Sequence, residues 1–147
     1  MEIEVKTFEE LTKEELYNLL QLRSEVFVME QNCVYQDIDG KDERALHILG
    51  RDEGKLVAYA RCFKSGDYFE EASIGRVLVQ ENYRRMGYGH EITKASIKAI
   101  KTKYKADTIK ISAQTYLVIF YESHGFKTVG DRYSEDGIPH VAMIKAL

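Results

Sequence analysis

Arginines and glycines that follow a predicted strand form the segment of this chain best suited to chemistry. The apolar stretch Ile74–Gln80 leads, after a short connection, into Arg84-Arg85-Met-Gly87-Tyr-Gly89, and a helical pattern begins there. The first turn of a helix has four backbone N–H groups without helical partners, and aligned peptide dipoles place roughly half a positive charge there. The glycines would let a pyrophosphate approach the backbone, and the arginines would add positive charge. The segment therefore predicts a phosphate-binding helix N-terminus.

Other phosphate and metal motifs fit the sequence less well. A dinucleotide fingerprint needs a third glycine after Gly89, where His-Glu-Ile follows, and no Gly-Lys-Ser or Gly-Lys-Thr occurs for a P-loop. Asp37-Ile-Asp39-Gly40 resembles a calcium loop, but Lys41 stands where a third ligand belongs and Ile48 where the closing glutamate belongs. We interpret it as an acidic turn. The four histidines show no HxxxH or HxH spacing, so no metal is predicted.

Length and composition indicate a single domain over residues 1–147. The chain is 44% hydrophobic and 31% charged, and it has one proline and no linker-like tract. Its net charge is -3 with scattered basic residues, which argues against nucleic acid as a partner. No apolar run approaches the roughly 20 residues that cross a bilayer, and the N-terminus is acidic, so we expect no membrane association and a cytoplasmic protein. Cys33 and Cys62 are expected to be reduced thiols.

The first part of the chain has a strand, a helix and a loop before the sheet continues. Ile3 and Val5 alternate as in a short strand, and Thr12–Glu15 fits a capping box that starts a helix. The apolar face of this helix extends to about residue 28, although Arg23 interrupts it. Residues 31–44 break the pattern and predict an exposed loop or a short second helix.

The remaining elements place the glycine segment between a strand meander and a long helix. Leu46–Leu49, Lys55–Phe63 and Ala72–Val79 read as an antiparallel meander, and the helical pattern after Gln80 extends to about Tyr104. A strand at Thr108–Ala113, a helical face ended by Gly125 and a final strand around His140–Ile144 follow. The predicted order is β-α-(α)-β-β-β-α-β-α-β-β, an α/β protein of the mixed α+β type.

Two blocks of residues resemble a known superfamily. Arg84-x-x-Gly87-x-Gly89 after a strand resembles the (R/Q)xxGx(G/A) signature of the GCN5-related N-acetyltransferases, and Phe120-Tyr121-Glu-Ser-His-Gly125-Phe126 resembles their second conserved block. Further segments resemble the ElaA-like branch of this superfamily: Arg23-x-x-Val-Phe-Val-x-Glu30-Gln31-x-Cys33, His47, Ile74-Gly-Arg-Val77, Ala113-Gln114 and Glu135-Asp-Gly-Ile-Pro-His140. The resemblance therefore covers nearly the whole chain. One departure is Val34, where that branch is expected to have proline.

The resemblance implies a mostly antiparallel twisted sheet that splays between its fourth and fifth strands to admit acetyl-coenzyme A. It also implies that the strand Arg76–Val79 offers backbone groups to the pantetheine arm. Ile74 and Val77 have opposite parity, so both can face one core only if a bulge intervenes near Gly75-Arg76. Gln114 could bond the arm or simply start a helix. The implied cofactor-binding residues are Val77, Leu78, Val79, Arg84, Arg85, Gly87, Tyr88, Gly89, His90 and Gln114.

The implied reaction is direct attack of a neutral amine on the acetyl thioester, without a covalent enzyme intermediate or a metal. Tyr121 matches the tyrosine that hydrogen-bonds the departing thiolate in the family, although an aromatic residue at helical spacing also suits a core. Glu30, His140 and His47 are candidate bases, and the sequence does not choose among them. An alternative is a non-catalytic acyl-CoA sensor or interaction module.

The amine acceptor is not readable from the sequence. A small molecule, a peptide N-terminus or a protein lysine would each fit, because a fold does not settle a substrate. The acidic segments Asp37–Glu43 and Glu135–Asp136 could recruit a basic protein or line a cleft for a cationic amine. A homodimer through sheet edges is compatible with the resemblance.

Overall fold

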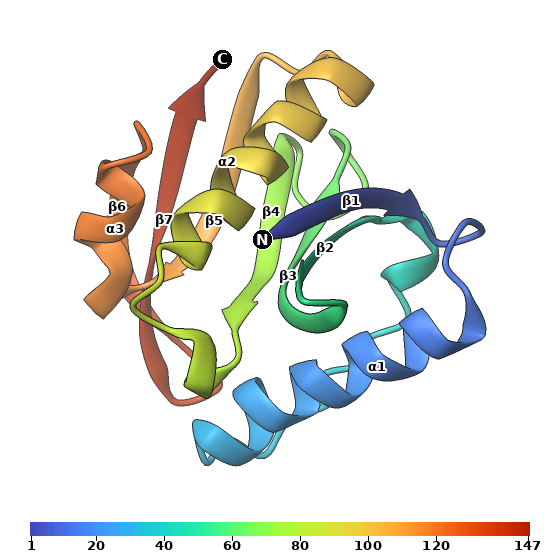
Figure 1. Cartoon of the computed structure of the whole chain (residues 1–147). Coiled ribbons are helices and arrows are strands. Elements are labelled where there is room, and N and C mark those ends of the chain that lie inside the picture. Colours follow the sequence, from blue (N-terminus) through green and yellow to red (C-terminus); the bar gives the residue numbers. More distant parts are fainter.

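A single sheet of seven strands organises the chain in the order β1-β2-β3-β4-β5-β7-β6. A computed structural model describes all residues from 1 to 147 (Figure 1). The strands are β1 (Glu2–Thr7), β2 (Leu46–Asp52), β3 (Lys55–Phe63), β4 (Ala72–Val79), β5 (Thr108–Gln114), β6 (Lys127–Glu135) and β7 (Ile138–Ala146). Only β4 and β5 run parallel, and every other neighbouring pair is antiparallel. The predicted mixed, mostly antiparallel sheet is confirmed.

Three α-helices flank this sheet, and two of them continue as π-helical turns. They are α1 (Lys13–Arg23), α2 (Tyr88–Ala99) and α3 (Val118–Glu122), with π-helical turns at Ser24–Glu30 and Ile100–Tyr104 and 3-10 turns at Asp42–Arg44, Glu81–Tyr83 and Thr115–Leu117. The predicted capping box is present, because Glu15 N–H donates to Thr12 Oγ1 at 3.0 Å and Thr12 N–H donates to the Glu15 carboxylate at 2.9 Å. This box fixes where the first helix begins.

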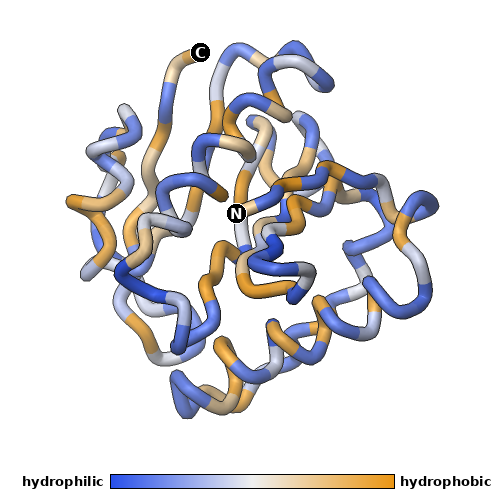
Figure 2. The backbone as a smooth tube through the Cα atoms, viewed as in Figure 1, coloured by the Kyte–Doolittle hydropathy of each residue, from blue (hydrophilic) through white to orange (hydrophobic).

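The helices cover opposite faces of the sheet. Ala58 and Ala60 of β3 belong to the larger core with Ile92 of α2, whereas Tyr59 between them packs with Leu19 of α1. Successive strand residues point to opposite faces, so α2 and α1 lie on the two sides of β3. Apolar residues recur along the central strands and alternate with polar ones along α1 (Figure 2).

Strand β4 contains the predicted bulge. Tyr59 pairs with Leu78 and Arg61 pairs with Gly75, so β4 has one more residue than β3 in this interval, and Arg76 has a positive φ of 51°. An extra residue reverses the side-chain parity, and it brings both Ile74 and Val77 against the α2 core. On its other edge β4 pairs with β5 only at Ala72–Ile109 and Ser73–Lys110.

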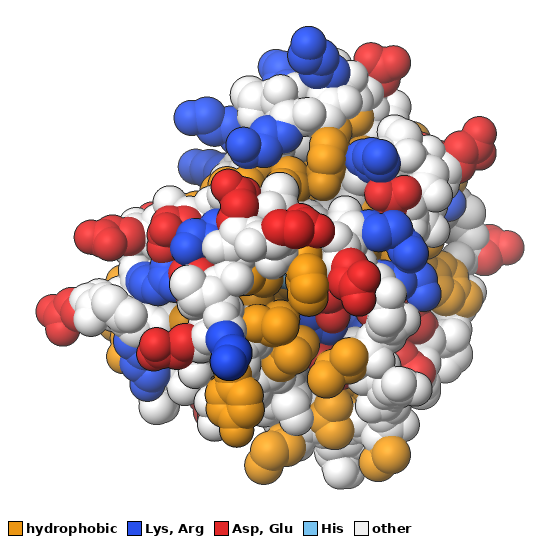
Figure 3. All heavy atoms as spheres, turned by 90° about the vertical axis from the view of Figure 1, so that its right-hand side faces the viewer, with side chains coloured by type: hydrophobic (Ala, Val, Ile, Leu, Met, Phe, Trp, Pro, Cys, Tyr) orange, Lys and Arg blue, Asp and Glu red, His pale blue; other side chains and the backbone are white.

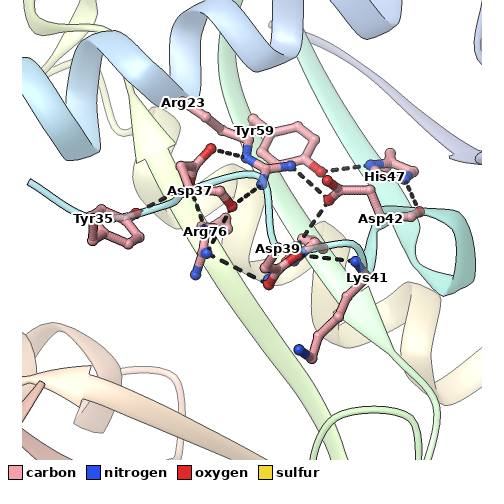
Figure 4. Close-up of polar contacts among 10 residues, drawn as sticks. Arg23, Tyr35, Asp37, Asp39, Lys41, Asp42, His47, Tyr59 and Arg76 are labelled. Carbon is pink, nitrogen blue, oxygen red and sulfur yellow. Dashed lines mark hydrogen bonds and ion pairs between the residues drawn. The ribbon is translucent and has the colours of Figure 1, made fainter. Parts of the chain in front are cut away.

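The prediction that residues 31–44 are exposed was wrong for two of the acidic residues, Asp37 and Asp42. Asp37 and Asp42 are buried, and they bind arginines from three separate elements (Figure 4). Arg23 does not merely interrupt the apolar face of α1: it is fully buried, and it donates to Asp37 Oδ2 at 2.9 Å and to Asp42 Oδ1 at 2.7 Å. The segment is a structural loop held by charge.

Arg61 and Arg76 complete this ion cluster. Arg61 donates to both carboxylate oxygens of Asp39 and to Asp42 Oδ1, and Arg76 donates to Asp37 Oδ1 at 2.8 Å. The charges of three arginines and three aspartates therefore balance. These aspartates are not available to recruit a basic partner, which corrects the expectation drawn from the acidic segment Asp37–Glu43. Burial opposes ionisation of Asp39, but the hydrogen bonds and charge of Arg61 outweigh it and hold its pKa below the usual value.

The surface carries charges of both signs. On the face shown in Figure 3, acidic and basic side chains are interspersed and hydrophobic ones gather in the lower half. None of the helices combines the length and the apolar character needed to span a membrane.

Candidate active site

One cavity of about 550 Å³ extends from the N-terminus of α2 along β4 to the turn between β6 and β7. It collects most of the residues that the sequence pointed to. The lining includes every proposed cofactor residue and all the candidate catalytic residues except His47: Glu30, Val77, Leu78, Val79, Arg84, Arg85, Gly87, Tyr88, Gly89, His90, Gln114, Tyr121 and His140. Segments far apart in the chain thus share one cavity.

The N-terminus of α2 has backbone donors that the protein itself does not use. Gly87 caps the helix at φ 79° without a side-chain hydrogen bond, and the first helical bond runs from Glu91 N–H to the Gly87 carbonyl at 3.1 Å. The N–H groups of Tyr88, Gly89 and His90 precede that bond, so they have no partner within the helix. No atom lies within 4 Å of where a Gly87 Cβ would stand. This terminus has the space and the polarity for an anion.

The two arginines before the helix differ in their contacts. Arg84 donates to both oxygens of Glu30, at 2.6 and 2.8 Å, and its Nε donates to the Val79 carbonyl at 2.9 Å. The hydrogen bond to Glu30 raises the pKa of Arg84. Arg85 is exposed, makes no hydrogen bond within the chain and has a φ of 70°. Arg85 is therefore the arginine free to meet a phosphate.

The bulged strand and its neighbour form the middle of the cavity. Arg76 and Val77 have no register partner on β3, and β5 pairs with β4 only before this point. The backbone around Val77 is consequently outside the sheet ladder. Gln114, at the end of β5, donates to Gln31 Oε1 at 3.2 Å, and its side chain does not cap the turn that follows.

Tyr121 stands on α3 with its ring in the core and its edge at the cavity. It is 8% exposed and packs edge-on against Phe120 and Phe126, at ring-centroid distances of 5.1 and 5.9 Å. Its hydroxyl has no hydrogen-bond partner within the chain. Burial raises the pKa of Tyr121 well above its ordinary value, with a smaller contribution from Tyr116. The phenol therefore keeps its proton near neutral pH and can donate it in a hydrogen bond.

The three candidate bases have different surroundings. His140 lines the cavity, its Nδ1 lies 2.7 Å from the Ile138 carbonyl, and its Nε2 lies 3.3 Å from Glu135 Oε2. Glu30 also lines the cavity, but both of its carboxylate oxygens bind Arg84. His47 lies outside the cavity, where its ring nitrogens bind Tyr59 and the Asp42 carbonyl and burial lowers its pKa. His47 is therefore a buried residue with a structural role, and it is not placed to act as the base.

A pair of histidines joins α2 to the turn that follows α3, beside this cavity. His90 Nδ1 lies 2.9 Å from His124 Nε2, and burial, followed by the charge of His90, lowers the pKa of His124. Sequence spacing gave no sign of this pair, because the two residues are 34 positions apart and come from separate elements. No group of three or more His, Cys, Asp and Glu side chains could hold a metal ion.

Comparison with known proteins gives the family of this mixed α/β protein. The family model for the acetyltransferase (GNAT) domain matches residues 7–147. The chain therefore belongs to the GNAT acetyltransferase family.

Individual relatives place it in the ElaA-like branch. The chain is 45% identical to protein ElaA of Escherichia coli over 138 residues, which cover 92% of this chain and 90% of that protein. The crystal structure of E. coli ElaA superimposes with a TM-score of 0.91 over 98% of both chains. An acyl-CoA N-acyltransferase from Pseudomonas aeruginosa superimposes with a TM-score of 0.93 at 36% identity, over 99% of this chain and 100% of that one.

Proposed function

We propose that this acetyltransferase moves the acetyl group of acetyl-coenzyme A to a primary amine by direct attack in a ternary complex. The observation that carries the proposal is the single cavity that joins the free N-terminus of α2, the bulge of β4, Tyr121 and His140. An anion site, exposed strand backbone and acid–base side chains are the parts that this reaction needs.

The cofactor is proposed to bind along α2 and β4. The N–H groups of Tyr88, Gly89 and His90 would hold the pyrophosphate, and the unpaired guanidinium of Arg85 would add a charged contact. The side chain of Tyr88 points elsewhere, because its hydroxyl binds Asp52. The backbone of Val77–Val79 and the amide of Gln114 would then bond the pantetheine arm. The absence of a side-chain cap on α2 supports this assignment.

The amine must lose a proton before it attacks. An alkylammonium with a pKa of about 10.4 costs about 4.6 kcal/mol to deprotonate at pH 7, so a base in the site is useful. We favour His140 over Glu30, because Arg84 already engages both oxygens of Glu30. Nδ1 of His140 lies against the Ile138 carbonyl and Nε2 lies 3.3 Å from Glu135 Oε2, so a proton taken up by this ring would be held between a carbonyl and a carboxylate.

The leaving group is a thiolate, and Tyr121 is proposed to receive it. When the amine nitrogen bonds to the acetyl carbon and the C–S bond breaks, negative charge develops on sulfur. A protonated phenol donates a hydrogen bond or a proton to that sulfur. The free hydroxyl of Tyr121 and its raised pKa support this role.

The test measures thiol release from acetyl-coenzyme A across a panel of primary amines. We expect release with at least one amine, and a fall in kcat of about 10²-fold in Tyr121→Phe. Tyr17→Phe is the matched control, because Tyr17 is 73% exposed and lies outside the cavity. Coenzyme A binding without thiol release for any amine would instead favour the non-catalytic module.

A further inference from the structure

A small niche opens from the cavity on the α1 side of the sheet. Arg61 and Phe63 of β3 pair with Gly75 and Ser73 of β4. Directly paired residues of antiparallel strands point to the same face, so all four lie together, and all four line the cavity. No atom lies within 4 Å of where a Gly75 Cβ would stand. The niche is therefore open above Gly75, just before the bulge.

Two buried polar atoms in this niche lack partners. Arg61 is 1% exposed and Ser73 is 2% exposed, yet neither Arg61 Nε nor Ser73 Oγ has a hydrogen-bond partner. Most buried polar groups in proteins are hydrogen-bonded, so each exception calls for a physical reason. Both residues line the same cavity, and an N–H donor and a hydroxyl are each complementary to an oxygen atom of a ligand.

The surroundings restrict what kind of ligand this is. The terminal nitrogens of Arg61 already bind Asp39 and Asp42, so its positive charge is compensated. The guanidinium also lies over the rings of Phe63 and Tyr68, at 4.9 and 5.8 Å, and those rings stack at 5.1 Å. The niche thus combines an apolar wall with one hydrogen-bonding spot, which suits a carbonyl or carboxylate oxygen at the end of an apolar chain.

Resting on the proposed function, we infer that this niche is an acceptor subsite that selects amines carrying a carbonyl or carboxylate oxygen remote from the reacting nitrogen. The reacting centre would lie beside the bulge at Arg76 and Val77. Ser73 precedes Arg76 by three residues, which is about 10 Å along a strand. A linear acceptor of comparable length would reach the oxygen site with its carbonyl while its amine meets the acetyl group.

The experiment compares three amines of similar length: hexylamine, 6-aminohexanamide and 6-aminohexanoate. Thiol release gives kcat/KM for each with the native protein, Ser73→Ala and Ser65→Ala. Ser65 is an exposed control outside the cavity. We expect the native protein to prefer an oxygen-bearing amine, and Ser73→Ala to lower that preference by about 2- to 10-fold, the worth of one hydrogen bond. The amide and the carboxylate distinguish neutral from anionic recognition.

Two further measurements separate loss of the oxygen contact from unfolding and from slow chemistry. Thermal unfolding should show that Ser73→Ala is as stable as the native protein, because its hydroxyl has no internal bond to lose. Titration of 6-aminohexanamide into protein saturated with coenzyme A should show weaker binding to Ser73→Ala, even if turnover is slow. Hexylamine turnover with no preference for oxygen would overturn this inference and leave the proposed function standing. Bound coenzyme A with no turnover of any amine would overturn the proposed function.

Discussion

Replacing Asp37 by asparagine should destabilise the protein more than any single surface change. The carboxylate accepts hydrogen bonds from Arg23 Nε at 2.9 Å, Arg76 Nε at 2.8 Å and the Tyr35 hydroxyl at 3.1 Å (Figure 4). The Asp37→Asn change would keep the shape of the side chain but remove its charge. The cluster would then hold three arginines against two aspartates, with Arg23 fully buried.

The expected cost follows from this charge imbalance. Removing one partner of a buried ion pair costs about 3–5 kcal/mol, because the other charge remains without compensation. Domains of this size are stable by about 5–15 kcal/mol, so Asp37→Asn should remove a large share of the free energy of unfolding. The new amide group would also place one donor against an arginine donor, which adds to the cost.

Urea denaturation followed by circular dichroism measures the effect. We expect the midpoint to fall strongly in Asp37→Asn and to stay near the native value in Asp131→Asn, because Asp131 is exposed and has no ion pair. A loss below about 1 kcal/mol, the range of exposed ion pairs, would refute the view that the cluster is a buried and balanced unit.

Two further predictions concern the cofactor site and acid stability. Arg85→Gln keeps the β-carbon and hence the backbone strain at φ 70°. It should weaken coenzyme A binding by roughly 5- to 10-fold at low ionic strength, and the effect should shrink with added salt. An unchanged affinity in isothermal titration would exclude this contact. In the folded protein the pKa values of Asp39 and Asp42 are lowered, because bonds and charges from arginines outweigh burial. The stability that they contribute is therefore full above about pH 5 and is lost as the pH falls through the ordinary aspartate pKa of about 3.9 toward the lower folded values, so the free energy of unfolding should already drop between about pH 5 and pH 3. A free energy of unfolding that stays constant over that pH interval would contradict this prediction.

Local patterns in the sequence predicted the parts of the fold that depend on neighbouring residues. The Thr12–Glu15 capping box, the strand meander and the glycine-rich start of α2 are each written within a few residues. The bulge in β4 followed from parity alone, because Ile74 and Val77 could not otherwise share a core face. Such features are decided by short-range geometry, which a single sequence records.

Contacts between distant elements could not be predicted in the same way. The sequence shows Asp37 as part of an acidic turn, and its partners Arg23 and Arg76 lie on a helix and a strand far from it in the chain. The pairing of Glu30 with Arg84 likewise appeared only in the fold, and it changed the ranking of the candidate bases. The packing of helices, loops and strands against one another brings such charges together, and composition does not reveal it.

The most direct test of the central claim is isothermal titration of coenzyme A into the native protein and two glycine variants. Gly87→Glu places a carboxylate at the start of α2, where the pyrophosphate is proposed to bind. Gly54→Glu is the matched control, because Gly54 also has a positive φ, of 82° against 79°, and open space around it, but lies outside the cavity. We predict saturable binding to the native protein and to Gly54→Glu, and at least tenfold weaker binding to Gly87→Glu. Absence of binding to the native protein at millimolar coenzyme A, or equal binding to all three proteins, would contradict the account.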